Sequence, residues 1–327
     1  MKASKALYIS KSESSHDQRF VESLGQILNI DEFYIGSDKG RGQKIDWTDY
    51  EILIASPLST GISIIPIESQ ILIIGICMAY EINEEAKSQE GFQEIQRNIN
   101  RCSAIVCDSE FIANKIIDNY SFSGEIIKIA YGCDQERFEE IEFEDRGVLR
   151  IVSTRNWTKI HSNQTTLSAL EKAYELGLKF VASFYGSGEE LTNETKREAS
   201  ALMPNQVSFH GAYTQEILPK ILENSEVFVS ASISDGCSVS LLEAMMAGRI
   251  CICRDFPTNR ELIKNGENGF LFSSEAQLIE IIINVSNLNF EEKKRISKAA
   301  RRSVLEIANW SRNSLELQNL ANRWLRK

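Results

Sequence analysis

A chain of 327 residues with 43% hydrophobic and 25% charged residues can bury substantial cores, and its length favours two domains. The formal net charge of -10 is concentrated in residues 1–146, where 14 Lys and Arg stand against 26 Asp and Glu. An acidic half of this kind repels nucleic acid and anionic lipid, so we expect no nucleic-acid partner and at most a peripheral association with membranes.

Short apolar runs alternate with amphipathic stretches in the first half, as in the strand-helix units of parallel sheets. The pattern predicts helices at residues 17–29, 92–101 and 110–119. It predicts strands at residues 6–10, 51–56, 70–77, 104–108 and 125–129. Together these elements favour one doubly wound sheet.

A charged run at residues 139–147 has neither a helical nor a strand period and predicts a linker. Residues 288–327 are expected to be all helical. Strands are predicted after the linker at residues 148–153, 179–185, 206–210, 227–230, 250–253 and 269–272. Two open sheets that face one another leave a cleft at the carboxyl ends of their strands, where such folds bind ligands.

The 7 cysteines include no C-x-x-C pair, which argues against a zinc site and against a disulfide framework. The longest apolar stretch, residues 71–80, is about half a membrane span, and the first residues lack the apolar run of a signal peptide. We therefore expect a cytoplasmic protein. We also expect no cofactor.

The segment from Ser234 to Leu262 carries the clearest chemical signal. Gly236 lets the backbone approach a ligand closely, and a helix that begins near Ser238 or Ser240 offers free N–H groups to an anion. Asp235, at the end of the preceding strand, can point its carboxylate at sugar hydroxyls or can be an ordinary turn residue. A phosphate or a sugar fits this segment.

Glu243 lies in an otherwise apolar helix, and a buried carboxylate is costly without hydrogen-bond partners. Hydroxyl groups of a ligand would supply such partners. A second interpretation is a capping box, in which Ser240 and Glu243 cap the start of the helix, and the two interpretations are compatible.

The spacing of Asp235-Gly236, Glu243-Ala244 and Gly248 resembles the signature of the retaining glycosyltransferases of family 4, also called glycosyl transferases group 1. In that family the first acidic residue is Glu. Further segments resemble the family in the same order along the chain, at residues 107–116, 127–140, 154–173, 184–190, 207–218, 259–272 and 309–324.

The resemblance implies the α/β GT-B fold, with two Rossmann-like doubly wound parallel-sheet domains that face a central cleft. It implies an acceptor-side domain at residues 1–146, completed by a C-terminal helix at residues 310–327. The domain that binds the nucleotide-sugar donor would be residues 147–309.

By the same resemblance, the family's diphosphate-binding Arg falls on Arg155, and its partner Lys falls on His161. Lys159 is an alternative to His161. A cation at this place is chemically reasonable, because the leaving group is a nucleoside diphosphate whose developing charge must be neutralised. Glu243 would bind the donor ribose, and Asp235 would bind the donor sugar.

The remaining donor contacts implied by the resemblance come mainly from the backbone. The sugar and phosphates would be held by Gly236, Cys237, Ser238, Val239 and Ser240. The base would be held by the Gly186–Gly188 turn and by Ala212 and Tyr213. Glu261 would lie near the mouth of the cleft or would cap its own helix.

The first half departs from the family pattern. The usual Gly-rich loop is replaced by residues 10–20, which offer His16 and Arg19 as acceptor-side contacts, and a His expected within residues 75–85 is missing. No Asp-x-Asp motif occurs anywhere in the chain, so we expect no metal ion in the site.

The expected activity is the retaining transfer of a sugar, as a hexosyltransferase, from a UDP- or GDP-sugar to a hydroxyl of a carbohydrate or glycoconjugate, in polysaccharide or glycoconjugate synthesis. One alternative is a sugar-nucleotide epimerase or hydrolase on the same fold, which would turn over without an acceptor. Another is a non-catalytic subunit that binds a nucleotide sugar, which would bind without turnover.

Overall fold

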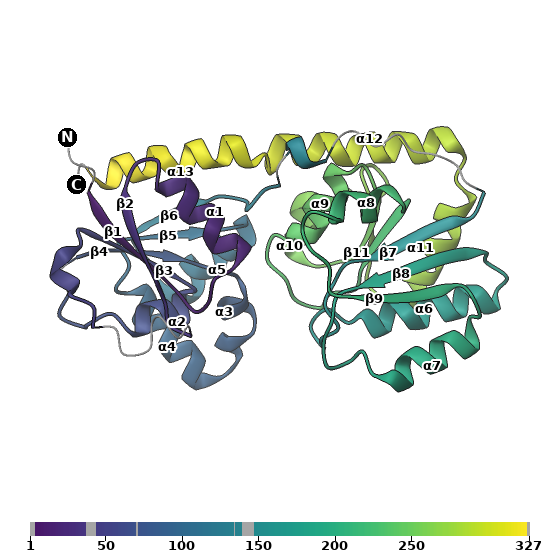
Figure 1. Cartoon of the computed structure of the whole chain (residues 1–327), viewed down its shortest axis with the longest axis horizontal. Helices are drawn as coiled ribbons and strands as arrows, with labels where there is room; N and C mark the ends of the chain where they lie inside the picture. The colour runs from purple at the N-terminus through teal and green to yellow at the C-terminus, as the bar shows by residue number, and fades with distance from the viewer. Residues whose placement is uncertain (1–3, 37–43, 70, 134, 139–146, 326–327) are drawn as a thin grey trace. The chain divides into compact units, whose positions relative to one another are not determined.

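The computed structural model describes residues 4–36, 44–69, 71–133, 135–138 and 147–325 (Figure 1). The chain divides into two compact units. The first consists of Met1–Tyr131, Asp235–Cys237 and Trp310–Lys327, and the second of Gly132–Ser234 and Ser238–Asn309. Residues 139–146 of the predicted linker and Gln70 of a predicted strand lie outside the described residues.

A parallel six-stranded sheet forms the centre of the first unit, with strand order β2-β1-β3-β4-β5-β6. β1 pairs on either side with β2 and β3, so that Ala6 lies between Ile30 and Ile52. β3 is buried along its whole length, as expected for a strand covered on both faces. The strands are β1 Lys5–Ser10, β2 Asn29–Tyr34, β3 Ile52–Ser56, β4 Leu72–Ile76, β5 Ala104–Cys107 and β6 Glu125–Lys128.

The helices of the first unit follow its strands, and several begin at a serine whose side chain accepts a backbone N–H, as Ser14, Ser88 and Ser109 do. α2 packs against α4, and α1 packs against α13. The helices are α1 Ser15–Leu24, α2 Leu58–Ser63, α3 Tyr80–Asn83, α4 Gln89–Ile99, α5 Glu110–Tyr120 and α13 Trp310–Trp324, with 3-10 turns η1 Trp47–Asp49 and η2 Glu85–Lys87.

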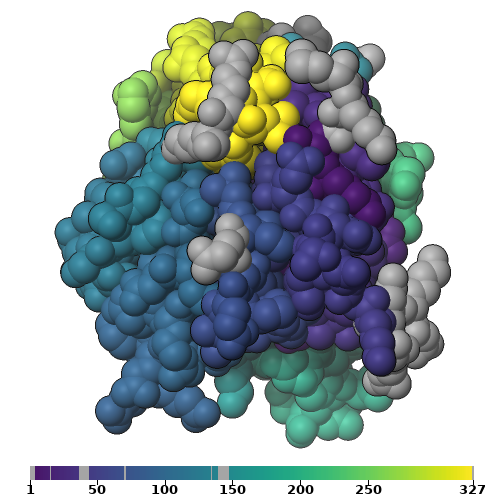
Figure 2. All heavy atoms as spheres, turned by 90° about the vertical axis from the view of Figure 1, so that its left-hand side faces the viewer, coloured from purple at the N-terminus to yellow at the C-terminus, as the bar shows by residue number. Residues whose placement is uncertain are grey.

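α13 joins the first unit from the far end of the chain. Its side chains Leu317, Leu320 and Trp324 are buried, and the Asn313 side chain donates a 2.9 Å hydrogen bond to the Ala130 carbonyl. Figure 2 shows the helix, in yellow, lying on the purple and blue atoms of this unit. The first unit is therefore built from segments that are distant in sequence.

The predicted helix at residues 17–29 is wrong in its second half. α1 ends at Leu24, and the next residues lead into β2, which the sequence did not predict. Leu24 and Leu28 are both buried, so the helical apolar spacing continues past the end of the helix. β2 is an edge strand in which only Phe33 is buried, and charged edge strands of this kind lack the apolar run of a central strand.

A second parallel six-stranded sheet forms the centre of the second unit, with strand order β12-β11-β10-β7-β8-β9. Each of its strands overlaps a predicted one. They are β7 Leu149–Ser153, β8 Phe180–Tyr185, β9 Val207–Gly211, β10 Val227–Ser230, β11 Ile250–Arg254 and β12 Phe270–Phe272. The prediction of a doubly wound α/β architecture is confirmed in both units.

The helices of the second unit form two packed groups. α6 packs against α7 and α11, whereas α9 and α10 pack against α12, and Figure 1 shows the two groups on opposite sides of the sheet. They are α6 Asn163–Glu175, α7 Asn193–Leu202, α8 Leu218–Glu223, α9 Val239–Met246, α10 Pro257–Leu262, α11 Glu275–Asn287 and α12 Phe290–Ile307, with the 3-10 turn η3 Gln135–Arg137. Among the described residues, no helix has the length and apolar character needed to span a bilayer.

Candidate functional site

The strand order of the second sheet reverses between β7 and β10. Open α/β sheets bind ligands beyond the carboxyl ends of the strands at such a reversal. Arg155 lies two residues after β7, and Ser238 lies eight residues after β10. Two of the predicted donor-binding segments therefore flank the reversal.

The Arg155 guanidinium lies at the start of α9. Its Nη1 donates hydrogen bonds to Ser238 Oγ at 2.9 Å and to Ser240 Oγ at 2.7 Å. Val239 is the first residue of α9 and Ser238 is its N-cap, without a side-chain capping bond. The free N–H groups of this helix start and the guanidinium together provide two sources of positive charge for an anion.

The predicted capping box of Ser240 and Glu243 is wrong. Ser240 is the second residue of α9 rather than its cap, and its hydroxyl accepts from Arg155 instead. Glu243 is 2% exposed in the middle of the helix. Burial raises the pKa of the Tyr213 phenol, and the negative charge of Glu243 raises that pKa further.

Lys159 and His161 lie in the turn between Arg155 and α6. Lys159 is exposed, whereas His161 is half-buried and its Nδ1 lies 3.2 Å from Thr158 Oγ1. The Ile160 carbonyl accepts a 2.8 Å hydrogen bond from the N–H of Ile233, in the loop after β10. The structure therefore joins the loops after β7 and β10 at Ile160, the residue between the two candidate partners of Arg155.

Gly186 and Gly188 follow β8 and pack against the loop that carries Arg155. A Cβ at Gly186 would come within 2.7 Å of the Arg155 carbonyl oxygen, and one at Gly188 within 2.1 Å of the Trp157 carbonyl oxygen. The two glycines have φ values of +94° and +154°. Close packing of two backbones explains these glycines whether or not they also contact a base.

An aromatic cluster that the sequence did not reveal lies at the ends of β8 and β9. The rings of Tyr185 and His210 stack with centroids 4.5 Å apart, and Tyr213 meets Tyr185 edge-on at 6.0 Å. The Tyr213 hydroxyl donates a 3.4 Å hydrogen bond to the Thr154 carbonyl, while Ala212 beside it is exposed. Only the alternation of side chains along two paired strands could have indicated the stack.

Two predicted acidic residues occupy loop and helix-end positions. Asp235 belongs with Gly236 and Cys237 to the tripeptide grouped with the first unit, and its Oδ1 accepts a 3.0 Å hydrogen bond from the Gly236 N–H. Glu261 is exposed at the penultimate position of α10. At that end of the helix Glu261 cannot cap the N-terminus, so its alternative role as a helix cap is wrong.

His16 and Arg19 lie on α1 in the first unit. The His16 ring is 5.4 Å from that of Tyr131, and Arg19 donates a 3.5 Å hydrogen bond to the Tyr131 carbonyl. The Arg19 guanidinium also lies 5.8 Å from the centre of the Trp310 ring. Burial lowers the pKa of His16, and the neighbouring Arg19 lowers it further, so the imidazole favours its neutral form.

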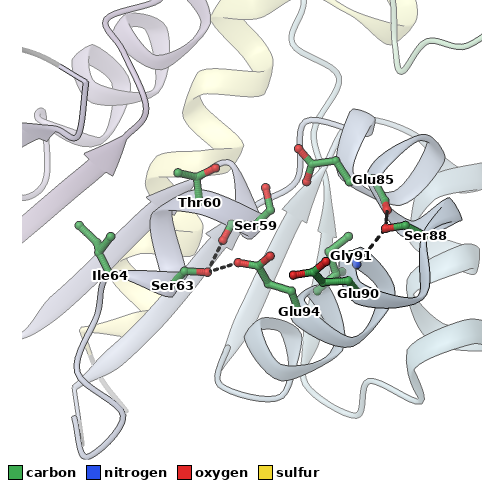
Figure 3. A pocket seen from close by; sticks show the side chains of 10 residues that line it. Ser59, Thr60, Ser63, Ile64, Glu85, Ser88, Glu90, Gly91 and Glu94 are labelled. Atoms are coloured by element: carbon green, nitrogen blue, oxygen red, sulfur yellow. Dashed lines mark hydrogen bonds between the residues drawn. The ribbon is translucent and has the colours of Figure 1, made fainter.

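A separate hollow of about 440 Å³ lies in the first unit (Figure 3). Its lining contains none of the predicted site residues, and the Glu94 carboxylate within it accepts a 2.8 Å hydrogen bond from Ser63. The lining residues are Ser59, Thr60, Ser63, Ile64, Glu85, Ser88, Glu90, Gly91, Glu94 and Ile95. Within the described ranges, no group of three His, Cys, Asp or Glu side chains is arranged to hold a metal ion.

The chain belongs to the family of glycosyl transferases group 1, whose family model matches residues 134–303. That segment contains the elements from β7 to α11 and most of α12. It includes Arg155, the start of α9 and Glu243.

The chain is 25% identical over 232 residues to an uncharacterized glycosyltransferase of Methanocaldococcus jannaschii, a match that covers 67% of this chain and 58% of that relative. Its structure is similar to that of sucrose-phosphate synthase from Thermosynechococcus elongatus, with a TM-score of 0.81, 12% identity and 99% coverage of both chains. It is also similar to Anabaena HepE in complex with UDP-glucose, with a TM-score of 0.76, 13% identity, and coverage of 98% of this chain and 100% of that one. These structural similarities confirm the GT-B fold.

Proposed function

We propose that this protein is a retaining, metal-independent glycosyltransferase of family 4 that transfers a sugar from a UDP- or GDP-sugar to a hydroxyl acceptor. The observation that carries this proposal is the Arg155 guanidinium, held by Ser238 and Ser240 at the start of α9. A cation and a helix N-terminus at one place suit the diphosphate of a nucleotide sugar. The donor would bind within residues 147–309.

In the proposed reaction, the bond between the anomeric carbon and the diphosphate oxygen breaks, and the acceptor oxygen bonds to the same face of that carbon. The proton of the acceptor hydroxyl passes to the departing diphosphate. Arg155, with Lys159 or His161, would stabilise the charge that develops on this leaving group without a metal ion. The protein would then act by positioning and charge stabilisation.

Glu243 and Asp235 would bind the donor through its hydroxyl groups, Glu243 at the ribose and Asp235 at the transferred sugar. Glu243 is 2% exposed, and a carboxylate in such a buried place favours strong hydrogen-bond donors such as ribose hydroxyls. The backbone from Gly236 to Ser240 would contact the sugar and phosphates, and Gly186, Gly188, Ala212 and Tyr213 the base.

The UDP-glucose in the HepE complex makes UDP the first nucleotide to test. His16 and Arg19 would contact a carbohydrate or glycoconjugate acceptor, and the biological product would be a polysaccharide or glycoconjugate. We also propose that this chemistry takes place in the cytoplasm and that any membrane association is peripheral.

The first experiment measures thermal shifts with UDP, GDP, ADP and CMP and their common sugar derivatives, each with and without EDTA. A ligand at about one hundred times its Kd stabilises the folded protein by about 2.7 kcal/mol, which shifts Tm by several degrees. We expect one nucleotide to give an EDTA-resistant shift in the wild type. Glu243→Ala should abolish the shift.

Glu226→Ala is the matched control. Glu226 is also 2% exposed in the second unit, and its carboxylate accepts a 3.0 Å hydrogen bond from the Arg150 N–H within the fold. This variant should lower Tm yet keep the shift on ligand addition. No shift with any nucleotide in the wild type would overturn the proposed function. Product formation without an acceptor would instead support an epimerase or hydrolase, and binding without turnover a non-catalytic subunit.

A further inference from the structure

Asn163 is a completely buried polar residue beside the proposed diphosphate site, at 0% exposure, and no step proposed above uses it. It is the first residue of α6. We propose that Asn163 is a positioning residue that fixes the backbone of Arg155, so that the guanidinium is already in place when a nucleoside diphosphate binds. This inference rests on the proposed function.

The oxygen and the nitrogen of the Asn163 carboxamide both form hydrogen bonds to the end of β7 and the loop that follows it. Its Oδ1 accepts a 2.8 Å hydrogen bond from the Ser153 hydroxyl, at the end of β7. Its Nδ2 donates to the Arg155 carbonyl at 2.8 Å and to the Asn156 carbonyl at 3.2 Å. The Asn163 side chain therefore connects Ser153, the last residue of β7, to the backbone of Arg155 and Asn156.

Only a carboxamide supplies this set of bonds. An Asp side chain has the same shape but offers no N–H donor when ionised, and Ala offers neither donor nor acceptor. Because the site is buried, loss of the two N–H donors would leave the Arg155 and Asn156 carbonyls to find other partners. The loop would then relax into other backbone conformations.

The opposite side of the loop is closed by the turn after β8. The Trp157 N–H donates a 3.0 Å hydrogen bond to the Ser187 carbonyl, and the Trp157 carbonyl accepts one of 3.1 Å from the Glu190 N–H. Gly186 lies against the Arg155 carbonyl with no room for a Cβ. The loop is thus held by Asn163 on one side and by the β8 turn on the other.

A fixed backbone matters because the Arg155 side chain must reach a particular place. Its Nη1 lies between Ser238 Oγ and Ser240 Oγ, which are on a different segment of the second unit. A charged group that is oriented before binding loses less entropy when the ligand arrives. Removal of the Asn163 amide should therefore weaken diphosphate binding through Arg155.

Asn268 provides a matched control for the structural cost of losing a buried carboxamide. It is 1% exposed in the same unit, where its Nδ2 donates to the Leu262 carbonyl at 3.0 Å and its Oδ1 accepts from the Lys264 N–H at 2.7 Å. None of these atoms belongs to the loop of Arg155. Asn268→Ala should lower Tm without a specific effect on phosphate recognition.

The test is a double-mutant cycle on the full chain, with calorimetric Kd values for UDP, GDP and ADP and for the matching nucleosides. The variants are Asn163→Ala, Asn268→Ala, Arg155→Ala and both Asn variants combined with Arg155→Ala. We expect Asn163→Ala to weaken diphosphate binding by about tenfold, since a displaced charged group loses much of its interaction, and to leave nucleoside binding nearly unchanged. In the Arg155→Ala background, Asn163→Ala should have no further effect.

Asn163→Gln and Asn163→Asp extend the cycle as conservative variants that are expected to differ. Asp should behave like Ala at neutral pH, whereas Gln, which keeps the amide N–H donors, should restore part of the diphosphate affinity. Equal weakening of nucleoside and diphosphate binding, or a full effect of Asn163→Ala without Arg155, would overturn the positioning role. A wild type that binds no nucleoside diphosphate would overturn the proposed function itself, together with the inference that rests on it.

Discussion

Arg155→Ala tests the proposed diphosphate site most directly. In the protein the guanidinium makes two hydrogen bonds through Nη1, to Ser238 and Ser240, which hold its head group beside α9. A hydrogen bond to a charged group contributes about 1.5–3 kcal/mol, and about 1.4 kcal/mol corresponds to a factor of ten. Loss of one such bond to the diphosphate should therefore weaken binding about 10- to 150-fold.

The assay is calorimetric titration with the nucleoside diphosphate that stabilises the wild type, at a temperature where every variant is folded. Arg155→Ala also loses its two hydrogen bonds to serine, which we expect to lower the free energy of unfolding by about 1–3 kcal/mol. Arg197→Ala removes the same charge from an exposed position on α7 and should leave the Kd unchanged. A Kd for Arg155→Ala within about threefold of that of Arg197→Ala would refute the reasoning.

Three further predictions concern other parts of the molecule. Gly188→Ala should lower the free energy of unfolding by about 2–5 kcal/mol in denaturant titrations, because its Cβ meets the Trp157 carbonyl at 2.1 Å, whereas Gly177→Ala has open space and should cost less. Asp235→Ala should slow sugar transfer by more than about threefold in steady-state assays, and a smaller change would contradict its role at the sugar. Burial raises the pKa of Glu81 from its usual 4.5 to about 7, so the folded state binds a proton that the unfolded state releases, and the free energy of unfolding falls as pH rises between these values. As pH rises across this window, the Tm of Glu81→Gln should therefore increase relative to that of the wild type. Parallel Tm curves for the two proteins would contradict a raised pKa of Glu81.

The sequence predicted the second sheet well because its strands are short apolar runs bounded by turn residues. β10, for example, is buried at all of its positions and needs no tertiary information to be recognised. β2 was missed because Asp31 and Glu32 interrupt its apolar pattern, and only its pairing with β1 makes it a strand.

At the candidate site, the sequence indicated residue types but not their partners. Arg155 was named from a motif, yet its contact with Ser238 and Ser240 joins segments 83 and 85 residues apart. The capping-box interpretation of Ser240 failed for the same reason, because a local rule competes with a distant partner. No sequence pattern indicates a role for Asn163, because its three hydrogen bonds depend on a loop conformation that the sequence does not reveal.

The position of α13 has a consequence for how the protein is made. Residues up to Tyr131 leave the ribosome first, but the helix that packs against α1 begins only at Trp310. At about 5–20 residues per second, translation of the intervening segment takes roughly 10–40 s. During that interval the apolar surface of α1 that contacts Trp310, including Phe20, lacks its partner. The first unit is thus completed only after the second unit has been synthesised.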